Sequence, residues 1–343
     1  MKKFCSFPEI GQYRQIVKTI TEQTRYLGKD EDGKSIYDFS KPLPIHKYTG
    51  TVKMHGTNAG VTINKDGEIY AQSRSNIITV EKDNAGFAFF VESKKEIFKG
   101  WFEELDFKGF DYITIFGEWC GGNIQKGVAI NGLPKMFVIF DIKRSYENIE
   151  QGDNIYSSNE EIKLFRDSEH NIFNIYDFQT YEIEIDFNRP EEIQNKIVEL
   201  TLQVEDECPV GKYFGSIGVG EGIVFTYRNE DGSKYRFKSK GLKHSNSKVK
   251  TLASVDTDKL NSVKEFVDYA VTENRLYQGI EKVFGINGEL DIKRTGDFLR
   301  WVVGDVIKEE LDTLSDNKLE PKDVTSAISV KARGWLLEKI NKF

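Results

Sequence analysis

Cysteine is scarce in this sequence of 343 residues. Its three cysteines, Cys5, Cys120 and Cys208, form no CxxC pair and no disulfide framework, which favours a reducing cytoplasm. Long apolar runs are missing as well, since no stretch approaches the ~20 residues of a membrane span. Lys2 and Lys3 are not followed by the apolar segment of a signal peptide. We therefore expect a cytoplasmic protein that has no membrane as a partner.

An excess of positive charge is also missing, because the net charge is −7. That balance argues against a general nucleic-acid coat protein. The charge is uneven, however. Residues 145–210 contain 17 acidic and 4 basic residues, whereas residues 234–250 contain 7 basic and no acidic ones. The overall acidity therefore hides a cationic strip, the name used below for residues 234–250.

What the sequence does contain is typical of a globular protein rich in strands. Hydrophobic residues make up 38% of the chain and charged residues 30%, which are ordinary values for a globular protein. The 24 phenylalanines and 15 tyrosines favour sheets, because aromatic side chains pack well on a pleated surface. The length indicates two domains.

Hydropathy patterns predict a first helix over residues 1–24 and then a β-hairpin. The strands of that hairpin are residues 48–54 and 59–64, on either side of a glycine turn. Asp66-Gly67 marks a second hairpin turn further along the chain. Lys53 is thereby expected at the mouth of the first hairpin.

Residues 28–35 satisfy the phosphate-loop expression GxxxxGK[ST]. A phosphate loop needs a buried strand before it and a helix after it, but two prolines follow closely here. Three carboxylates, Asp30, Glu31 and Asp32, would also stand where backbone amides must face phosphate. We therefore interpret this segment as a charged surface turn.

Further apolar segments complete the N-terminal part of the chain. We predict helices over residues 84–110 and 190–201, strands over 112–116 and 136–141, and a hairpin of strands 220–225 and 235–240. Residues 145–210 are interpreted as an insertion or an outer layer. The predicted fold class is α+β, with antiparallel sheets and flanking helices.

A change of composition predicts a domain boundary. Residues 244–256 read as a polar linker, and four helical faces of apolar residues follow it. Pro321 suits the first turn of the last of these helices. The sequence therefore predicts an N-terminal domain of residues 1–243 and an all-α C-terminal domain of residues 257–343.

Lys53 is a candidate nucleophile. A lysine that attacks a phosphate needs a lowered pKa, cations that hold the substrate, and carboxylates that hold a divalent metal. Glu118 and Glu221 each follow a glycine at the end or the start of an apolar strand, where a carboxylate is costly without a partner. The structural alternatives, a solvated lysine and carboxylates paired with surface cations, stay open.

Phosphate and base ligands have candidates as well. Lys238 and Lys240 are two residues apart on a predicted strand, so both point to one face and repel each other unless an anion lies between them. Phe140 ends a strand, where it either stacks on a purine or belongs to the core. Arg74 is suited to a phosphate or a ribose.

Four residues carry a resemblance to a known family. Lys53, His55, Gly56 and Asn58 match KxHGxN, which is nucleotidyltransferase motif I of the RNA ligase 2 group of ATP-dependent polynucleotide ligases. That group includes phage RNA ligases and trypanosome RNA-editing ligases. DNA ligases and mRNA capping enzymes carry KxDG instead. The motif thus resembles that of an RNA ligase.

Later segments follow in the family's order. Those that resemble its motifs Ia, III, IIIa, IV and V are, in turn, Arg74, Phe116-Gly117-Glu118-Trp119, residues 137–141, Glu221-Gly222-Ile223-Val224 and Lys238-Ser239-Lys240. The helical tail resembles the family's own C-terminal domain. Val52 departs from the pattern, because the family usually has an acidic residue before the lysine. Residues 25–47 look like an insertion, and residues 145–210 have no clear counterpart.

The resemblance implies an adenylyltransferase domain with ATP as the covalent AMP donor and Mg²⁺ or Mn²⁺ as the metal. It implies that Lys53 is catalytic and that Glu118 and Glu221 hold the metal. The residues that it implies for ATP binding are Val52, Lys53, Met54, Asn58, Arg74, Glu118, Phe140, Glu221, Lys238 and Lys240.

The implied activity is the sealing of 3′-hydroxyl and 5′-phosphate RNA ends, through lysyl-AMP and adenylylated RNA, in RNA repair. The implied partner is an RNA end, in a nicked duplex or a broken RNA. The protein is expected to be a monomer. The cationic strip would bind backbone phosphates with an affinity that falls as salt rises. The alternatives are a DNA ligase or capping-type nucleotidyltransferase, and a non-catalytic RNA-binding protein on the same scaffold.

Overall fold

A computed structural model shows the chain as two compact units. The first comprises residues 1–193 and 200–239, and the second comprises residues 194–199 and 240–343. Apart from His244, the predicted linker lies outside the described residues, as does the start of the predicted helical domain. The structure describes residues 2–147, 155–230, 232, 234–241, 243–244, 263–285 and 289–340.

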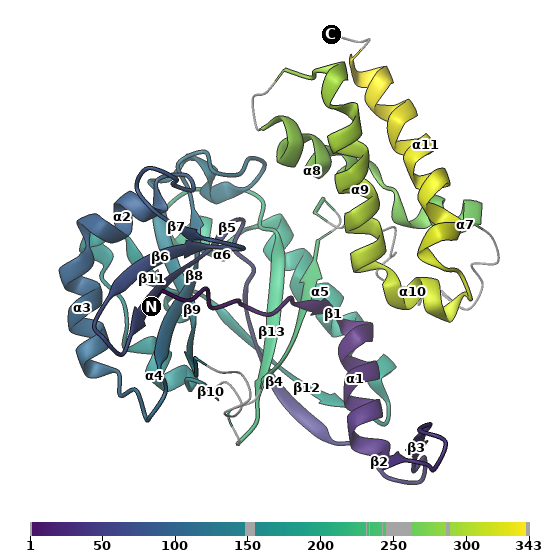
Figure 1. Ribbon diagram of the computed structural model, residues 1–343, viewed down its shortest axis with the longest axis horizontal. Coiled ribbons are helices and arrows are strands. Elements are labelled where there is room, and N and C mark those ends of the chain that lie inside the picture. Colours follow the sequence, from purple (N-terminus) through teal and green to yellow (C-terminus); the bar gives the residue numbers. More distant parts are fainter. Residues whose placement is uncertain are drawn as a thin grey trace. The chain divides into compact units, whose positions relative to one another are not determined.

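The first sheet has five strands in the order β1-β14-β13-β4-β12. The pairs β4–β12 and β4–β13 are antiparallel, whereas β1 runs parallel to β14. The strands are β1 (Gly11–Gln12), β4 (Ile45–Val52), β12 (Thr180–Asp186), β13 (Gly222–Arg228) and β14 (Lys234–Lys240). The predicted hairpin of residues 220–225 and 235–240 corresponds to the neighbours β13 and β14 (Figure 1).

The second sheet has the order β10-β9-β8-β5-β6-β7, and β11 pairs with β9 in parallel. One of its faces is apolar and packs against α2 (Phe87–Ser93) and α3 (Lys95–Glu104), which lie on that side in Figure 1. The strands are β5 (Gly56–Asn64), β6 (Ile69–Ser73), β7 (Ile77–Ile78), β8 (Tyr112–Cys120), β9 (Met136–Ser145), β10 (Ile155–Tyr156) and β11 (Ile172–Asn174). Together the two sheets and their helices confirm the predicted α+β class.

The strands on either side of Lys53 belong to different sheets, so the prediction that they form a hairpin is wrong. β4 is hydrogen bonded to β12 and β13, and β5 is hydrogen bonded to β6 and β8. Gly56 is not there to make a turn. A Cβ at this position would lie 2.4 Å from the carbonyl oxygen of Trp119, so glycine allows β5 to approach β8. Lys53 therefore lies on the connection between the two sheets.

Residues 145–210 are not an insertion or outer layer, because they supply strands to both sheets. β12 pairs with residues 45–51 of β4, and β11 pairs with β9. On β12 the acidic residues alternate outward, while Tyr181, Ile183 and Ile185 are buried. The high acidity of the segment concealed an amphipathic strand. Its helices are α4 (Asn159–Lys163), α5 (Gln194–Asp206) and α6 (Pro209–Tyr213).

Three predicted helices have different bounds in the structure. The helix predicted from residue 1 begins only at Tyr13, as α1 (Tyr13–Arg25), because the buried Cys5 and Phe7 belong to a separate apolar cluster. The helix predicted over residues 84–110 is interrupted at Lys94, between α2 and α3. The helix predicted over residues 190–201 is a 3₁₀ turn (Pro190–Ile193) followed by α5.

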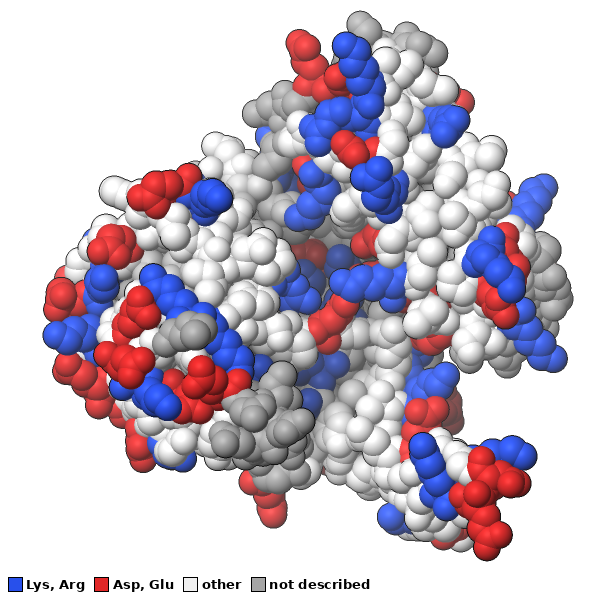
Figure 2. Space-filling view, in the orientation of Figure 1, with Lys and Arg blue, Asp and Glu red and all other residues white. Residues whose placement is uncertain are grey.

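The charged turn at residues 28–35 connects two short strands, which confirms that it is not a phosphate loop. β2 (Tyr26–Lys29) and β3 (Ser35–Tyr37) form a sheet of their own. Asp30 Oδ1 accepts the backbone N–H groups of Asp32 and Lys34. Acidic and basic side chains are interspersed over this hairpin, at the lower right of Figure 2.

A buried ion cluster joins the two sheets. Asp141 of β9 accepts hydrogen bonds from Lys234 and Arg236 of β14, and Arg228 of β13 lies 3.8 Å away. The side chains of Asp141 and Lys234 are only 2% and 1% exposed. The ring of Tyr156 covers the cations, with Lys234 Nζ 4.6 Å and Arg236 Cζ 4.7 Å from its centroid. The charges are therefore excluded from water and depend on one another.

The second unit is helical. Its described helices are α7 (Val263–Ala270), α8 (Glu273–Phe284), α9 (Thr295–Glu309), α10 (Leu311–Asp316) and α11 (Pro321–Ile340). The four predicted helical segments correspond to α7, α8, α9 and α11, and α11 begins at Pro321 as expected; the short α10 was not predicted. Arg275 is fully buried and donates to Asp305 at 2.8 Å. Within the described residues, no helix combines the length and the apolar character that a transmembrane segment requires.

We predict that Asp141→Asn lowers the free energy of unfolding by about 3–5 kcal/mol, because it leaves Lys234 and Arg236 buried without a counter-charge. Urea denaturation followed by circular dichroism measures the change. The control is Glu192→Gln, which removes the exposed pair with Arg189 and is expected to cost at most about 1 kcal/mol. Equal effects of the two substitutions would contradict the structural role of the cluster.

Candidate functional site

Lys53 follows the last residue of β4 and lies against the start of β13. Its backbone N–H donates to the carbonyl of Gly222 at 2.8 Å. Its Nζ is 2.8 Å from Oε1 of Glu221, the residue before β13. The other oxygen of Glu221, Oε2, is 2.9 Å from Nδ1 of His55. One carboxylate, only 3% exposed, thus contacts both the lysine and the histidine of the KxHGxN segment.

A second carboxylate, Glu118, lies on β8 directly opposite Asn58 of β5. Its Oε1 accepts the backbone N–H of Gly56 at 3.0 Å. The pKa of Glu118 is raised to about 7, mainly by burial and in part by the charge of Glu221, although Lys53, His55 and the Gly56 amide lower it. Gln125 donates to the carbonyl of Gly56 at 3.1 Å and so fixes the same loop from the other side. The predicted residues Lys53, Asn58, Glu118 and Glu221 are therefore brought together.

The two carboxylates fit a divalent metal whose remaining ligands are water and phosphate oxygens. Mg²⁺ binds through one or two carboxylates together with water and substrate phosphates, and Glu118 and Glu221 supply such a pair. Within the described residues no group of three or more potential ligands forms a metal cage, so the remaining oxygens must come from water or a phosphate. The raised pKa of Glu118 shows that its ionised form lacks sufficient compensation, which a nearby cation would provide.

Phe140 lies on the same face of the second sheet as Glu118. β9 has a bulge opposite Phe116 and Gly117 of β8, and a bulge turns two successive side chains to one side. The ring of Phe140 is partly exposed and meets Phe7 edge-on, with centroids 5.0 Å apart. It is therefore part of a small aromatic cluster and also borders the site face.

Val52 and Met54, on either side of the lysine, have buried side chains, 3% and 6% exposed. Val52 is paired with Ile223 of β13. The apolar residue at position 52, where the resembled family usually has an acidic one, thus packs between neighbouring strands. A carboxylate in its place would be buried in the sheet.

Lys238 and Lys240 lie on β14, and alternation along the strand places them on the face of Lys234 and Arg236. That face is turned toward β9, because Lys234 and Arg236 bind Asp141. The prediction that the whole cationic strip binds RNA phosphates is wrong for Lys234 and Arg236, because Asp141 already compensates their charges within the fold. Positions 242 and 245–250 of the strip lie outside the described residues.

Arg74 is exposed in the loop between β6 and β7. It lines a shallow depression together with Thr57, Ser73, Lys82 and Asn84. Thr57 and Asn58 are neighbours on β5, but successive side chains of a strand point to opposite faces. This depression therefore lies on the face of the sheet that packs against α2, and Arg74 is not brought together with Asn58 and Glu118. Asp83 also lines this depression. Its carboxylate accepts the backbone N–H groups of Ala88 and Phe89 at the start of α2.

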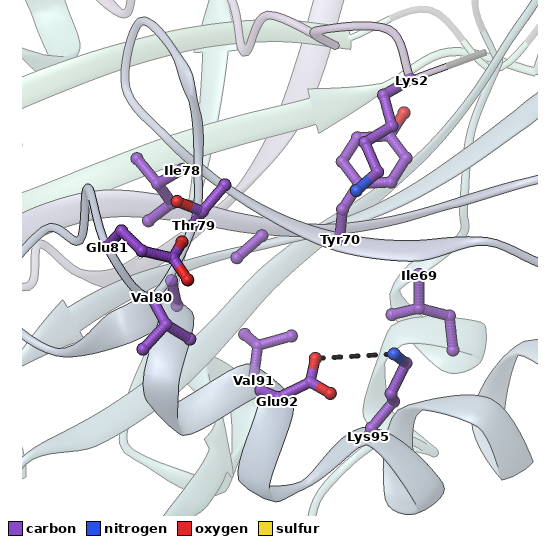
Figure 3. A pocket seen from close by; sticks show the side chains of 12 residues that line it. Lys2, Ile69, Tyr70, Ile78, Thr79, Val80, Glu81, Val91, Glu92 and Lys95 are labelled. Carbon is purple, nitrogen blue, oxygen red and sulfur yellow. Dashed lines mark hydrogen bonds and ion pairs between the residues drawn. The ribbon is translucent and has the colours of Figure 1, made fainter.

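A second depression lies between the β6–β7 hairpin and α2 (Figure 3). Its lining is mainly apolar, with Ile69, Val80 and Val91 among its residues, and Glu92 and Lys95 form an ion pair of 3.5 Å at its edge. None of the residues predicted for ATP binding lines it. It is therefore separate from the candidate site.

We predict that wild-type stability falls, relative to Glu118→Gln, as the pH rises from about 4.5 to 7. The pKa of Glu118 is about 7 in the folded chain against an ordinary value of 4.5, so the folded state holds the proton more tightly and loses this advantage on deprotonation. Urea denaturation at several pH values measures the difference between the two proteins. If the stability of wild type and Glu118→Gln changed with pH in parallel, the raised pKa would be contradicted. The control is Glu92→Gln at an exposed position, whose stability should change with pH in parallel with that of wild type.

Comparisons with known proteins agree with the motif. A sequence model of the RNA ligase family matches residues 46–240, which include both carboxylates and the strands of residues 145–210. A comparison with curated proteins found no match.

Among solved structures, a Naegleria gruberi RNA ligase with pyrophosphate has a TM-score of 0.44 and 19% identity, over 70% of this chain and 57% of that one. A mutant of the same ligase with ATP and manganese has a TM-score of 0.43 and 19% identity, over the same shares. The matched region is thus little more than half of the Naegleria ligase. The family match spans more than half of the present chain and contains Lys53, Glu118 and Glu221: the chain belongs to the RNA ligase family.

Proposed function

We propose that this protein is an ATP-dependent RNA ligase that joins a 3′-hydroxyl to a 5′-phosphate. The observation that carries the proposal is the contact of Glu221 with both Lys53 and His55, at 2.8 and 2.9 Å. It gives a lysine an acceptor for its proton within a site that also contains Glu118. Covalent transfer of AMP requires this combination of nucleophile and carboxylates.

In the first step, Lys53 Nζ would attack the α-phosphate of ATP. A P–N bond forms to give lysyl-AMP, and the bond from the α-phosphorus to the bridging oxygen breaks to release pyrophosphate. The lysine must lose its proton to become nucleophilic. Glu221, with Oε1 2.8 Å from that nitrogen, would accept it.

Mg²⁺ or Mn²⁺ would be held by Glu118 and Glu221 with water and phosphate oxygens. The metal would offset negative charge on the phosphates during the transfer. Phe140 would stack on the adenine, with Val52 and Met54 near the base. Asn58 would orient a phosphate, and Lys238 and Lys240 would neutralise the phosphates.

In the following steps, the RNA 5′-phosphate would take AMP from the lysine, restoring the free amine. The 3′-hydroxyl of the other end would then attack the adenylylated phosphate, forming the phosphodiester and releasing AMP. Arg74, exposed in the loop between β6 and β7, would bind a phosphate or ribose of the RNA, and the helical unit would help to hold the RNA. We propose RNA repair by a cytoplasmic monomer as the setting, in line with three free and buried cysteines.

His55 also favours an RNA ligase over a DNA ligase or capping-type enzyme, in which aspartate occupies this position. In this chain His55 donates or accepts at Glu221, whereas an aspartate would place a second carboxylate beside it. The family match and the complete set of motif residues disfavour a non-catalytic RNA-binding protein. Competition between ATP and GTP for labelling, and between nicked RNA and nicked DNA for sealing, separates these enzymes.

We predict that incubation with α-labelled ATP and magnesium labels the wild-type protein covalently, and that Lys53→Ala and Lys53→Arg abolish the label because the nucleophile is lost. Gel electrophoresis of the denatured protein measures it. Lys65→Ala, which removes a surface pair with Asp111, is the matched control and should label normally. An unlabelled wild type, or a labelled Lys53→Ala, would refute the proposal.

We predict that His55→Asp slows the same labelling by about ten-fold or more, because like charges at a buried site shift pKa values and oppose phosphate binding. His55→Asn, which keeps a hydrogen-bond donor without adding a charge, should lose less. The rate of label incorporation under single-turnover conditions measures both. Equal rates for wild type and His55→Asp would mean that the contact with Glu221 does not matter.

A further inference from the structure

The β2–β3 hairpin exposes large apolar side chains. It forms a two-stranded sheet by itself, beyond the end of α1 in Figure 1. Tyr26 is 44% exposed, Leu27 63%, Ile36 42% and Phe39 74%. An isolated two-stranded hairpin is only marginally stable, and a cluster of exposed apolar residues usually marks an interaction site. The hairpin therefore has the character of a binding element.

Three aromatic rings form a row on one face of this hairpin. Tyr26 is paired with Tyr37 across the strands, with ring centroids 5.9 Å apart. Phe39 continues the row, 6.2 Å from Tyr37. The guanidinium of Arg25 lies over Phe39, 5.8 Å from its centroid. This set, Tyr26, Tyr37, Phe39 and Arg25, is called the aromatic row below.

The charges beside the aromatic row are cationic. Lys29 is paired with Ser35, and the two-residue period of β3 puts Ser35 and Tyr37 on the same face. Asp38 follows the last residue of β3 and accepts the N–H and the hydroxyl of Ser40. Asp30 is engaged by backbone amides of the turn. Arg25 and Lys29 therefore flank the rings, while the acidic residues lie in the turns.

We infer that the aromatic row binds single-stranded RNA, with bases stacked on the rings and phosphates against Arg25 and Lys29. This rests on the proposed function, which supplies RNA as the substrate. Exposed rings bind successive bases without regard to sequence, because every base has a flat face.

The hairpin would hold a part of the RNA that is distant from the joined ends. The chain passes from the hairpin into β4, which has 8 residues and so is ~26 Å long at about 3.3 Å per residue. Lys53 follows its far end. The span corresponds to on the order of eight stacked nucleotides at about 3.4 Å each, so RNA of clearly fewer nucleotides would not reach both places.

The test measures, by fluorescence anisotropy, the binding of labelled single-stranded RNA of 4 and 24 nucleotides to the full-length protein. We expect Phe39→Ala to weaken binding of the 24-mer about five-fold or more, because one stacked base is lost. Phe39→Trp should restore it. Ile36→Ala, on the opposite face of the hairpin, is the matched control and should bind like wild type.

Three outcomes would overturn the inference. These are unchanged binding by Phe39→Ala, an equal loss with Ile36→Ala, or a wild-type self-association in the absence of RNA that Phe39→Ala abolishes, which would assign the row to protein docking. Labelling with ATP is measured in parallel and should be unchanged in Phe39→Ala. Failure of labelling in wild type would refute the ligase proposal, whereas the RNA binding assay tests the aromatic row independently.

Discussion

The buried carboxylate of Glu221 is the group on which the candidate site depends. Its two oxygens bind Lys53 and His55, which come from the connection between the sheets, while its own backbone leads into β13. A carboxylate that is nearly inaccessible to water is tolerated only with such partners. The same contact therefore holds the lysine in a defined place, and in the proposed mechanism it also provides the acceptor for the lysine proton. Glu118, whose burial is less well compensated, completes a site that favours a cation.

A different set of charges connects the two sheets. Asp141 on β9 binds Lys234 and Arg236 on β14, and this cluster is shielded by Tyr156. Because β14 also carries Lys238 and Lys240, the buried cluster fixes the strand from which those lysines project. Basic residues only two positions apart thus have different tasks. Two of them stabilise the fold, and the next two are proposed to meet phosphate.

Prediction from sequence succeeded where a local pattern decides the structure. The apolar runs at residues 112–116 and 136–141 became parts of β8 and β9, and the helical periods beyond residue 260 became α7, α8, α9 and α11. Prediction from sequence failed where the structure of a segment depends on which distant strand it pairs with. The segments around Lys53 alternate like a hairpin, yet each pairs with other strands. The strand β12 was missed because its outward acidic side chains dominate its composition.

The sequence by itself was enough to select the candidate nucleophile, its histidine neighbour and the two carboxylates, because KxHGxN and the glycine–glutamate pairs are local features. It also determined the α+β class and the helical tail, since hydrophobic periodicity reflects which face is buried. Only the tertiary structure decided that Glu221 contacts Lys53 and His55, and that Lys234 and Arg236 bind Asp141. Those contacts join residues more than ninety positions apart, and no local pattern encodes which distant charge a buried group will meet.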